Sequence, residues 1–236
     1  ARRPYNACTL GFAVAPRLNA SGRMSDASLG VELFLCRDPN RADEIIARLN
    51  KLNELRQQDE ANILNDAIRR LEPCDLSDTR AIVLRSETWN AGVIGIAASR
   101  IAEMYHRPTI LFSESDGILK GSARSIDGVN IHEVLCCCRE FFVRFGGHAK
   151  AAGITMESAF FEDFRFKLNA CLKAGYDDSV FIPCKRYEFD IPLEQVTGEL
   201  IAELTRLAPF GESNPSPVFR SRHVAVSRLR RFGSDA

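Results

Sequence analysis

The longest regular pattern of hydrophobic positions in this chain runs from Pro39 to Leu71. No proline or glycine interrupts it after Pro39, and its hydrophobic residues recur at helical spacing. They are Ile45, Leu49, Leu52, Ile63, Leu64, Ala67, Ile68 and Leu71. Asp38 followed by Pro39 is typical of a helix N-cap and first helical position, and Pro73 ends the pattern. We therefore predict one helix of about 33 residues, ~50 Å long at 1.5 Å per residue.

The middle of this predicted helix, Asn53–Asn62, is mostly polar. A long helix with a polar centre is typical of a connector that crosses solvent between two domains. A helical hairpin with a break near Gln57 is the alternative, because two shorter helices would fit a compact domain more easily.

After Pro73 the pattern changes to short hydrophobic runs that alternate with amphipathic segments. The predicted strands are Arg80–Arg85, Pro108–Phe112, Leu119–Ser125 and Gly153–Met156. The predicted helices are Gly92–Tyr105, Asn130–Phe141 and Phe160–Leu172. Strands separated by helices indicate an α/β domain from about residue 78 to 175, long enough to bury a core of its own.

The two ends of the chain differ from this central domain. An irregular, basic segment leads into an apolar helix, Ala27–Cys36. Beyond the domain, Tyr187–Ile191 alternates like a strand, and Pro192–Leu207 is helical. Apolar and basic residues then alternate over Arg220–Arg231, which predicts the first strand or hairpin of a β domain.

Composition limits the protein class without deciding the function. Of the 236 residues, 45% are hydrophobic and 26% charged, which suits a soluble globular protein of one or two domains. The net charge is zero, so any basic binding site must be local. No apolar run approaches the ~20 residues that span a bilayer, so no membrane is expected. The chain lacks an initial Met and ends abruptly, and we expect a piece of a longer protein.

The eight cysteines do not have the spacing of a zinc site. Cys136, Cys137 and Cys138 are consecutive, and three adjacent residues of a helix cannot all face one ion. We predict free thiols in a reducing cytoplasm.

The segment Phe145–Ile154, FGGHAKAAGI, is the first candidate for chemistry. Gly146 and Gly147 leave the backbone bare, and His148 and Lys150 add an imidazole and an ammonium. Successive main-chain N–H groups in glycine-rich turns form concavities that bind anions. The segment therefore predicts an anion site, with a tight turn that carries an incidental histidine as the alternative.

Two more segments combine basic and small residues. In Ala15–Ala27, APRLNASGRMSDA, the guanidinium groups of Arg17 and Arg23 can each hold phosphate oxygens. In GSARSI, Ser122 and Arg124 lie on the same side of a strand, because side chains repeat every two residues. The alternatives are a surface loop with solvated arginines and an edge strand with a polar face.

Together these motifs resemble the RecJ family of single-stranded-DNA-specific 5′→3′ exonucleases, in the DHH phosphoesterase superfamily. The matching pieces occur in the family's order and cover nearly the whole chain. They are APRLNASGRMSDA, the N-x-x-R pattern of Asn53 and Arg56, WNAGVIGIAASRI, GSARSI, FGGHAKAAG and APFGESNPSPVF. The Gly-Gly-His run is shared with other phosphoesterases and with alanyl-tRNA synthetase relatives, whereas PRLNASGR together with PFGESNPSPVF is more specific.

The resemblance implies a layout in four parts. Residues 1–37 would be the C-terminal tail of the DHH catalytic domain, and 38–73 the connecting helix. Residues 74–178 would be the DHH-associated α/β domain, a mixed sheet flanked by helices. Residues 179–236 would be a linker helix and a truncated OB-fold, the start of a β-barrel.

The resemblance also implies a nuclease that uses Mn²⁺ or Mg²⁺ in DNA repair and recombination. This chain has no Asp-His-His run and no D-x-D, so we expect it to bind no metal ion and to be inactive alone. Its expected partner is single-stranded DNA, with a single-strand-binding protein or a helicase as candidate protein partners. A phosphodiesterase of short oligonucleotides or cyclic dinucleotides, without the OB start, and a non-catalytic RecJ paralogue that binds nucleic acid remain alternatives.

Residue roles follow from the same resemblance. Ser122 and Arg124 would hold the 5′-phosphate, and His148, beside Gly146 and Gly147, would stabilise charge at the scissile phosphate. Arg17 and Arg23 would contact the DNA backbone. The residues expected to narrow the passage to one strand are Asn53, Arg56, Gln57 and Arg100. The OB surface would carry Arg228, Arg230 and Arg231, with Phe219 and Phe232 either stacking on bases or packing in the core.

Overall fold

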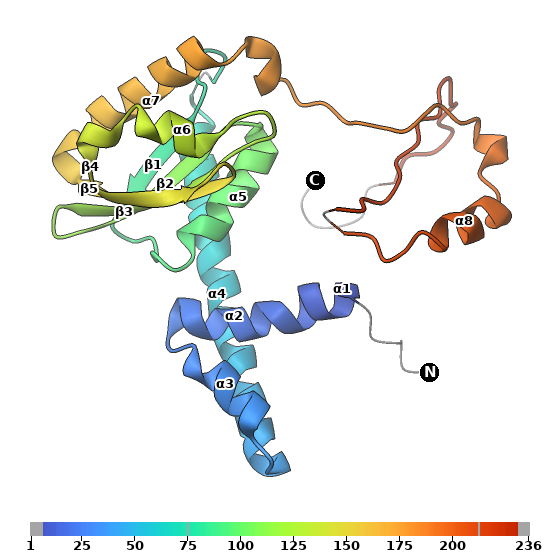
Figure 1. Cartoon of the computed structure of the whole chain (residues 1–236), viewed down its shortest axis with the longest axis horizontal. Helices are drawn as coiled ribbons and strands as arrows, with labels where there is room; N and C mark the ends of the chain where they lie inside the picture. The colour runs from blue at the N-terminus through green and yellow to red at the C-terminus, as the bar shows by residue number, and fades with distance from the viewer. Residues whose placement is uncertain (1–6, 75, 212, 231–236) are drawn as a thin grey trace. The chain divides into compact units, whose positions relative to one another are not determined.

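The computed structural model describes residues 7–74, 76–211 and 213–230. Arg231 and Phe232, both predicted for the OB surface, lie outside the described residues. The chain divides into two compact units, Ala1–Pro183 and Cys184–Ala236 (Figure 1). Each unit is described by itself.

The predicted long helix is present as α4, Pro39–Leu71, and it is continuous over 33 residues. The Asp38 side chain accepts a hydrogen bond from the Asn40 backbone N–H at 3.0 Å, as expected of an N-cap. The helix has no break at Gln57, so the hairpin alternative is wrong. Its buried positions form one stripe: Ile45, Leu49, Asn53, Arg56, Glu60, Ile63, Ala67 and Leu71.

The first half of α4 packs against helices that the sequence reading missed in part. The segment expected to be irregular is helical: α1, Ala7–Thr9, a short π-helix, Leu10–Val14, and α2, Ala15–Met24. The predicted apolar helix is α3, Ser28–Leu35. Small residues of α2, Ala20 and Ser21, are buried, because they allow α2 to lie close to its neighbours.

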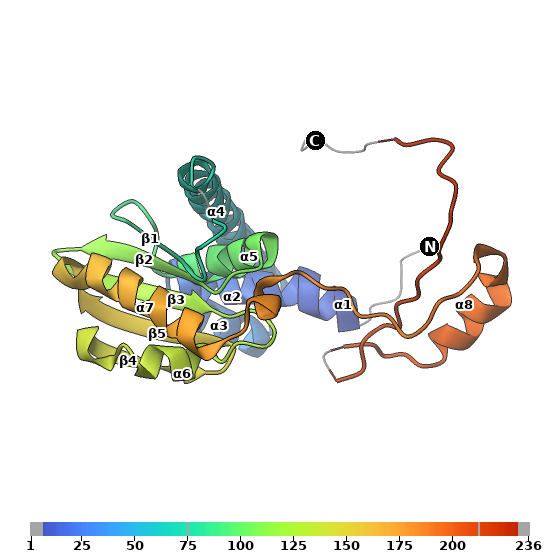
Figure 2. The same cartoon turned by 90° about the horizontal axis from the view of Figure 1, so that it is seen from above.

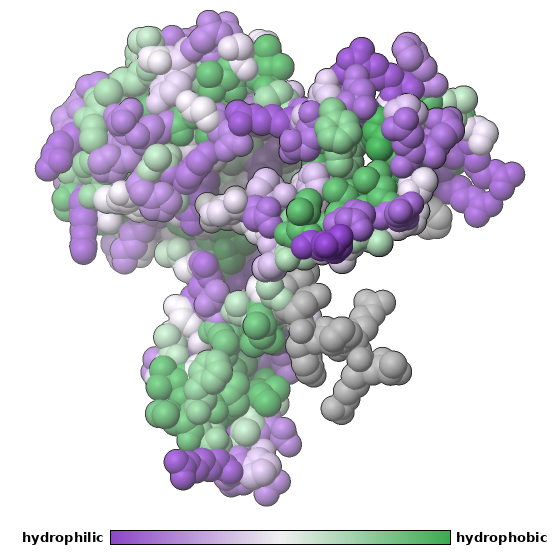
Figure 3. Space-filling view, turned by 45° about the vertical axis from the view of Figure 1, so that its right-hand side comes forward, coloured by the Kyte–Doolittle hydropathy of each residue, from purple (hydrophilic) through white to green (hydrophobic). Residues whose placement is uncertain are grey.

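The hydrophobic cluster between these helices contains Leu29, Ile45 and Leu49. The outer side of α3 stays apolar, since Phe34 and Leu35 are largely exposed. Figure 3 shows this hydrophobic surface over the lower helices of the first unit.

The second half of α4 packs against an α/β domain built on one five-stranded sheet. The strands are β1, Ile82–Ser86, β2, Thr109–Ser115, β3, Ile118–Arg124, β4, Phe142–His148, and β5, Ala151–Glu157. Their order is β1-β2-β3-β5-β4. Only β1 and β2 are parallel, with α5, Ile94–Tyr105, as the crossover, so the sheet is mixed as predicted.

Helices cover the two faces of this sheet unequally (Figure 2). The helices α6, Ile131–Cys136, and α7, Phe161–Gly175, enclose the larger core, which includes Phe112, Leu119, Met156 and Phe164. On the other face α5 and the end of α4 cover Ile82 and Leu111, near β1 and β2. On that second face, the described helices therefore cover the half near β1 and β2 and leave the half formed by β3, β5 and β4 uncovered.

The strand β4 is the main element that the sequence reading missed. The helix predicted over Asn130–Phe141 ends at Cys136, and a 3-10 turn, Arg139–Phe141, leads into β4. Gly146 and Gly147 lie in this edge strand, and the described glycines with positive φ are Gly117 and Gly128. The turn expected at Gly146–Gly147 is therefore wrong, whereas anion binding at these residues stays a prediction. Pairing with β5 holds both residues in extended backbone instead.

The second unit contains little regular structure among residues 184–211 and 213–230. It has α8, Gly198–Thr205, a 3-10 turn, Leu193–Gln195, and two isolated bridges. The strands predicted over 187–191 and 220–231 are reduced to one of these bridges, Asp190 with Arg220. A strand needs a neighbouring ladder to persist, and the described segments of this unit supply none.

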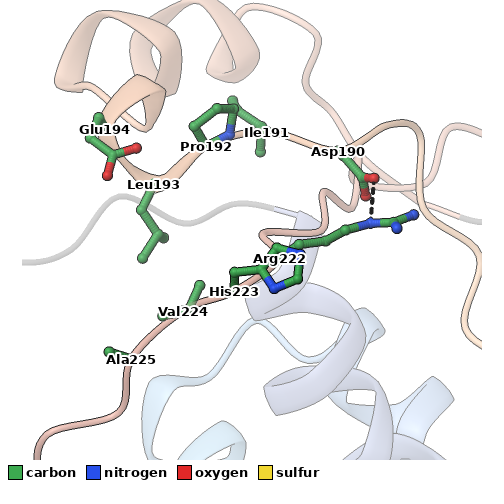
Figure 4. Close-up of a pocket in the computed structure, with 9 residues that line it drawn as sticks. All are labelled: Asp190, Ile191, Pro192, Leu193, Glu194, Arg222, His223, Val224 and Ala225. Carbon is green, nitrogen blue, oxygen red and sulfur yellow. Dashed lines mark ion pairs between the residues drawn. The ribbon is translucent and has the colours of Figure 1, made fainter.

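A cavity of about 380 Å³ lies in this unit (Figure 4). At its edge Asp190 accepts from Arg220 at 2.6 Å and pairs with Arg222 at 2.7 Å. Asp190 thus compensates one of these two positive charges. The ring of Phe219 packs on Phe189 with centroids 4.9 Å apart.

The cysteines and the helices of the described residues bear on thiol state and membrane spans. Cys36, Cys74, Cys136, Cys137, Cys138, Cys171 and Cys184 are free. No described helix is long and apolar enough to cross a membrane.

Candidate nucleic-acid interface

The uncovered half of the sheet carries three rows of side chains on β3, β5 and β4. Directly paired residues of antiparallel strands point to the same face, and the pairing register therefore defines each row. The first row is Arg124, Ala151 and His148; the second is Ser122, Gly153 and Gly146; the third is Lys120, Thr155 and Arg144. We call these nine residues the open face.

The middle row of the open face is bare. A Cβ atom added to Gly146 or Gly153 would meet nothing within 4 Å. Gly147, which points to the other face, is different, because its Cβ would lie 2.3 Å from the Ala151 carbonyl oxygen. The bare row leaves room for a ligand, and Gly147 permits the close approach of β4 to β5.

Ser122 and Arg124 lie at the boundary with α5. Arg124 Nη1 donates to Ser122 Oγ at 2.8 Å, so the Ser122 hydroxyl proton remains available to a ligand. Gly95 of α5 makes room for both side chains, since a Cβ there would lie 2.6 Å from Arg124 Nη2 and 2.8 Å from Ser122 Oγ. Ser122 and Arg124 were predicted from the two-residue period of a strand to lie on the same side, and the structure confirms this.

Arg23 approaches the same place from the end of α2. Its Nη1 donates to the Gly92 carbonyl oxygen at 3.0 Å, just before α5 begins. Burial, and then the charge of Arg23, lower the pKa of Arg124 from its ordinary value. Two guanidinium groups are thus held close together, and neither forms an ion pair with a described carboxylate. An anion placed here would relieve their repulsion.

His148 stands in the same row as Arg124, two strand spacings or ~10 Å away. Its Nδ1 accepts from the Lys150 backbone N–H at 3.3 Å, which directs Nε2 outward as the ring's N–H donor. The Lys150 ammonium does not join the open face, because it pairs with Asp127 at 2.5 Å. The structure therefore brings Arg23, Ser122, Arg124 and His148 to one region.

The backbone N–H groups at the start of the helix predicted from Gly92 have partners within the chain. The helix begins at Ile94, and the Gly92 N–H donates to Asn90 Oδ1 at 2.9 Å. The N–H groups of Val93 and Ile94 donate to the Asn90 carbonyl oxygen.

Three other predicted arginines are engaged elsewhere. Arg17 donates to Asn50 Oδ1 at 2.7 Å and to the Ala13 carbonyl oxygen at 2.5 Å. Arg56 and Arg100 both pair with Glu60, each at 2.5 Å.

Asn53 accepts from Arg56 at 3.2 Å inside the same buried group, whereas Gln57 is exposed on α4. The centre of α4 was predicted to cross solvent. This prediction is wrong for the face of the helix that carries Asn53, Arg56 and Glu60, which are buried. Polar residues are buried there because their charges are paired.

The sequence reading missed two basic residues of the open face, Lys120 and Arg144. Lys120 could have been found, since it precedes Ser122 and Arg124 at the same period of two. Arg144 could not, because β4 was read as the end of a helix followed by a turn. Among the described residues no group of three His, Cys, Asp or Glu side chains stands together as a metal site would need.

Family models match most of the second half of the chain. The DHHA1 domain matches residues 78–174, and the RecJ OB domain matches residues 187–236.

Curated relatives match nearly the whole chain. The single-stranded-DNA-specific exonuclease RecJ of Bacillus subtilis is 38% identical over 96% of this chain and 29% of its own length. That of Escherichia coli is 35% identical over 96% of this chain and 41% of its own length. The chain thus spans 29% to 41% of the length of these relatives.

Solved structures are similar as well. RecJ from Thermus thermophilus in complex with Mg²⁺ has a TM-score of 0.78 and 33% identity, over 91% of this chain and 33% of that one. An exonuclease RecJ bound to manganese has a TM-score of 0.65 and 33% identity, over 74% of this chain and 43% of that one.

Proposed function

Because this chain belongs to the RecJ family, we propose that it is the DNA-holding part of a single-stranded-DNA-specific exonuclease. In this proposal the open face and Arg23 grip the phosphates of one DNA strand. The relatives that support it are named for that activity. The direction of digestion, from the 5′ end, is a prediction that comes from the family resemblance.

One observation supports this proposal above the rest: two adjacent guanidinium groups, Arg23 and Arg124, without a described carboxylate partner. A terminal 5′-phosphate carries up to two negative charges and three acceptor oxygens. Arg124 and Arg23 would each donate to it, and the free proton of Ser122 would donate to a third oxygen. A strand with a 5′-hydroxyl would lose these contacts.

His148 would act on the neighbouring phosphodiester. Its outward Nε2–H can donate to a non-bridging oxygen and stabilise the charge that develops there during hydrolysis. The bare row of Gly146 and Gly153 would let the sugar–phosphate backbone lie against the sheet.

Solved relatives hold Mg²⁺ or Mn²⁺. The described residues of this chain do not fit such an ion, because no cluster of ligand side chains is present among them. We infer that the ion is held by a part of the protein that the relatives share beyond these residues. Our expectation is that the 236-residue chain binds DNA without cleaving it.

The remaining assignments are proposals of the same kind. Residues 1–37 would be the tail of the catalytic domain, 38–73 the connecting helix, 74–178 the associated domain, and 179–236 a linker helix and a truncated OB-fold. Arg228 and Arg230, both exposed, would continue the DNA path on the OB surface.

A single-strand-binding protein or a helicase as partner, and a cytoplasmic location, stay predictions. The match to a RecJ OB domain supports an exonuclease over a phosphodiesterase of very short substrates.

The test compares single strands that differ only in their 5′ end. We expect Arg124→Ala to weaken binding of a 5′-phosphorylated strand by roughly 10- to 100-fold, since a hydrogen bond between charged groups contributes about 1.5–3 kcal/mol. Binding of the 5′-hydroxyl strand should fall much less. Arg165→Ala is the matched control, because Arg165 pairs with Glu162 on α7, on the other side of the sheet. Equal losses for both strands would refute the clamp.

A further inference from the structure

We propose that Lys120 and Arg144 form a second anion site, which holds an internal phosphodiester of the strand whose 5′ end is at Arg124. We call it the Lys120–Arg144 hollow. The identity of the ligand rests on the proposed function, whereas the site itself rests on the geometry of the third row of the open face.

The hollow has a volume of about 530 Å³. Its lining residues are Lys120, Gly121, Arg144, Phe145, Gly146, Gly153, Ile154 and Thr155. Lys120 and Arg144 both pair directly with Thr155, so they flank the hollow from opposite sides, two strand spacings or ~10 Å apart. Their long side chains can therefore converge on one group above Thr155.

Neither cation of the hollow has a hydrogen bond or an ion pair within the described part of the chain, and both are exposed. Other cations of the same domain are neutralised: Arg85 pairs with Glu114 at 3.4 Å, and Lys150 pairs with Asp127 at 2.5 Å. The hollow thus keeps two positive charges over a floor of glycine and threonine. Such a site is complementary to a negatively charged group.

The hollow and the 5′ clamp lie in different rows of the open face. Lys120 and Arg124 are four residues apart on β3, or ~14 Å at 3.4 Å per residue. The Arg124 guanidinium donates to Ser122, whereas Lys120 and Arg144 both flank Thr155. The two cationic rows can therefore hold different groups of one ligand, and the bare row of Gly146 and Gly153 lies between them. A sugar–phosphate chain fits this alternation of charged, bare and charged rows.

The chemistry of the hollow favours a phosphodiester over a nucleobase. Its side-chain groups over the floor are an ammonium, a guanidinium and a hydroxyl, which are mainly donors. A base would need an aromatic platform. The nearest ring, Phe145, packs instead on His132, with centroids 5.5 Å apart, and on Phe142 at 5.3 Å. Phosphate oxygens are acceptors only, so they match this set.

The test uses the 236-residue chain, metal-free buffer and oligothymidylates of about eight nucleotides with either a 5′-phosphate or a 5′-hydroxyl. We expect the double variant Lys120→Ala/Arg144→Ala to bind both strands about tenfold more weakly, since each exposed ion pair contributes up to about 1 kcal/mol. The ratio between the two strands should not change. The slope of log affinity against log salt should fall by about 0.7 for each cation removed.

Two comparisons separate the hollow from the clamp. Arg165→Ala/Lys173→Ala removes the same charge from paired residues of α7 and should change neither affinity nor slope. Lys120→Arg/Arg144→Lys keeps both charges and should retain the slope.

Unchanged affinity and slope in the double alanine variant would overturn the hollow and would leave its face free to contact an acidic protein surface. A loss confined to 5′-phosphorylated strands would also overturn it. If Arg124→Ala does not change the preference for a 5′-phosphate, the clamp fails independently of this result.

Discussion

Two groups of arginines in the first unit are arranged in opposite ways. In one, Glu60 of α4 lies between Arg56 of the same helix and Arg100 of α5, with both distances 2.5 Å. In the other, Arg23 and Arg124 lie close together with no described carboxylate between them. The first group joins two helices by compensated charge, whereas the second stores repulsion that a ligand can relieve. Paired arginines thus indicate architecture, and unpaired neighbours indicate a binding site.

The largest expected effect comes from removing the compensating charge. We expect Glu60→Ala to lower the free energy of unfolding by about 3–5 kcal/mol, because it leaves the buried guanidinium of Arg56 without a carboxylate partner. Urea denaturation followed by circular dichroism measures this loss. Glu54→Ala is the matched control, since Glu54 forms an exposed pair with Lys51 at 3.4 Å on the same helix. A loss no larger than that of the control would contradict the structural role of the first group.

The fold shows how far such distinctions can be predicted from sequence. The helix α4 was predicted almost to the residue, because its capping residues and its hydrophobic period are local signals. The buried centre of α4 was not, since Arg56 and Glu60 look like solvent-facing residues until α5 brings Arg100 to them. The helix α2 was missed for a similar reason. Its burial depends on α4, which is distant in sequence.

In the candidate site, too, local sequence patterns identify some residues, whereas others depend on contacts between distant segments. Ser122 and Arg124 follow from the two-residue period of a strand, and the same period could have identified Lys120, which was missed. Arg144 and the strand role of Gly146 depend on pairing with β5, which local propensity cannot reveal. Arg23 and Arg124 are far apart in the sequence, so only the folded chain brings the charge of Arg23 close enough to lower the pKa of Arg124.

An intermediate loss of stability is expected where β4 approaches β5 closely, at Gly147. We expect Gly147→Ala to lower the free energy of unfolding by about 1–3 kcal/mol, because its Cβ would lie 2.3 Å from the Ala151 carbonyl oxygen. Gly146→Ala provides the control, since its Cβ would meet nothing within 4 Å. Thermal unfolding of both variants gives the difference. If the two variants are equally stable, the strands approach less closely than described.

The smallest expected effect on stability comes from Arg23, which has no described carboxylate partner. A small effect here would differ most clearly from the large effect expected at Glu60. We expect Arg23→Gln to change the free energy of unfolding by no more than about 0.5 kcal/mol, because the exposed Arg23 forms no described ion pair. Loss of its hydrogen bond to Gly92 and relief of its repulsion of Arg124 act in opposite directions. Affinity for a 5′-phosphorylated strand should nevertheless fall, by up to about tenfold.

For Arg23→Gln, both the free energy of unfolding and the affinity for DNA must be measured. Arg69→Gln is a suitable control, since Arg69 is exposed and pairs with Asp66 at 2.6 Å, away from the open face. It should change neither quantity appreciably. If Arg23→Gln destabilises the chain by several kcal/mol and leaves DNA binding intact, Arg23 is a structural residue like Arg56. The distinction between compensated and uncompensated arginines would then not predict which of them meet DNA.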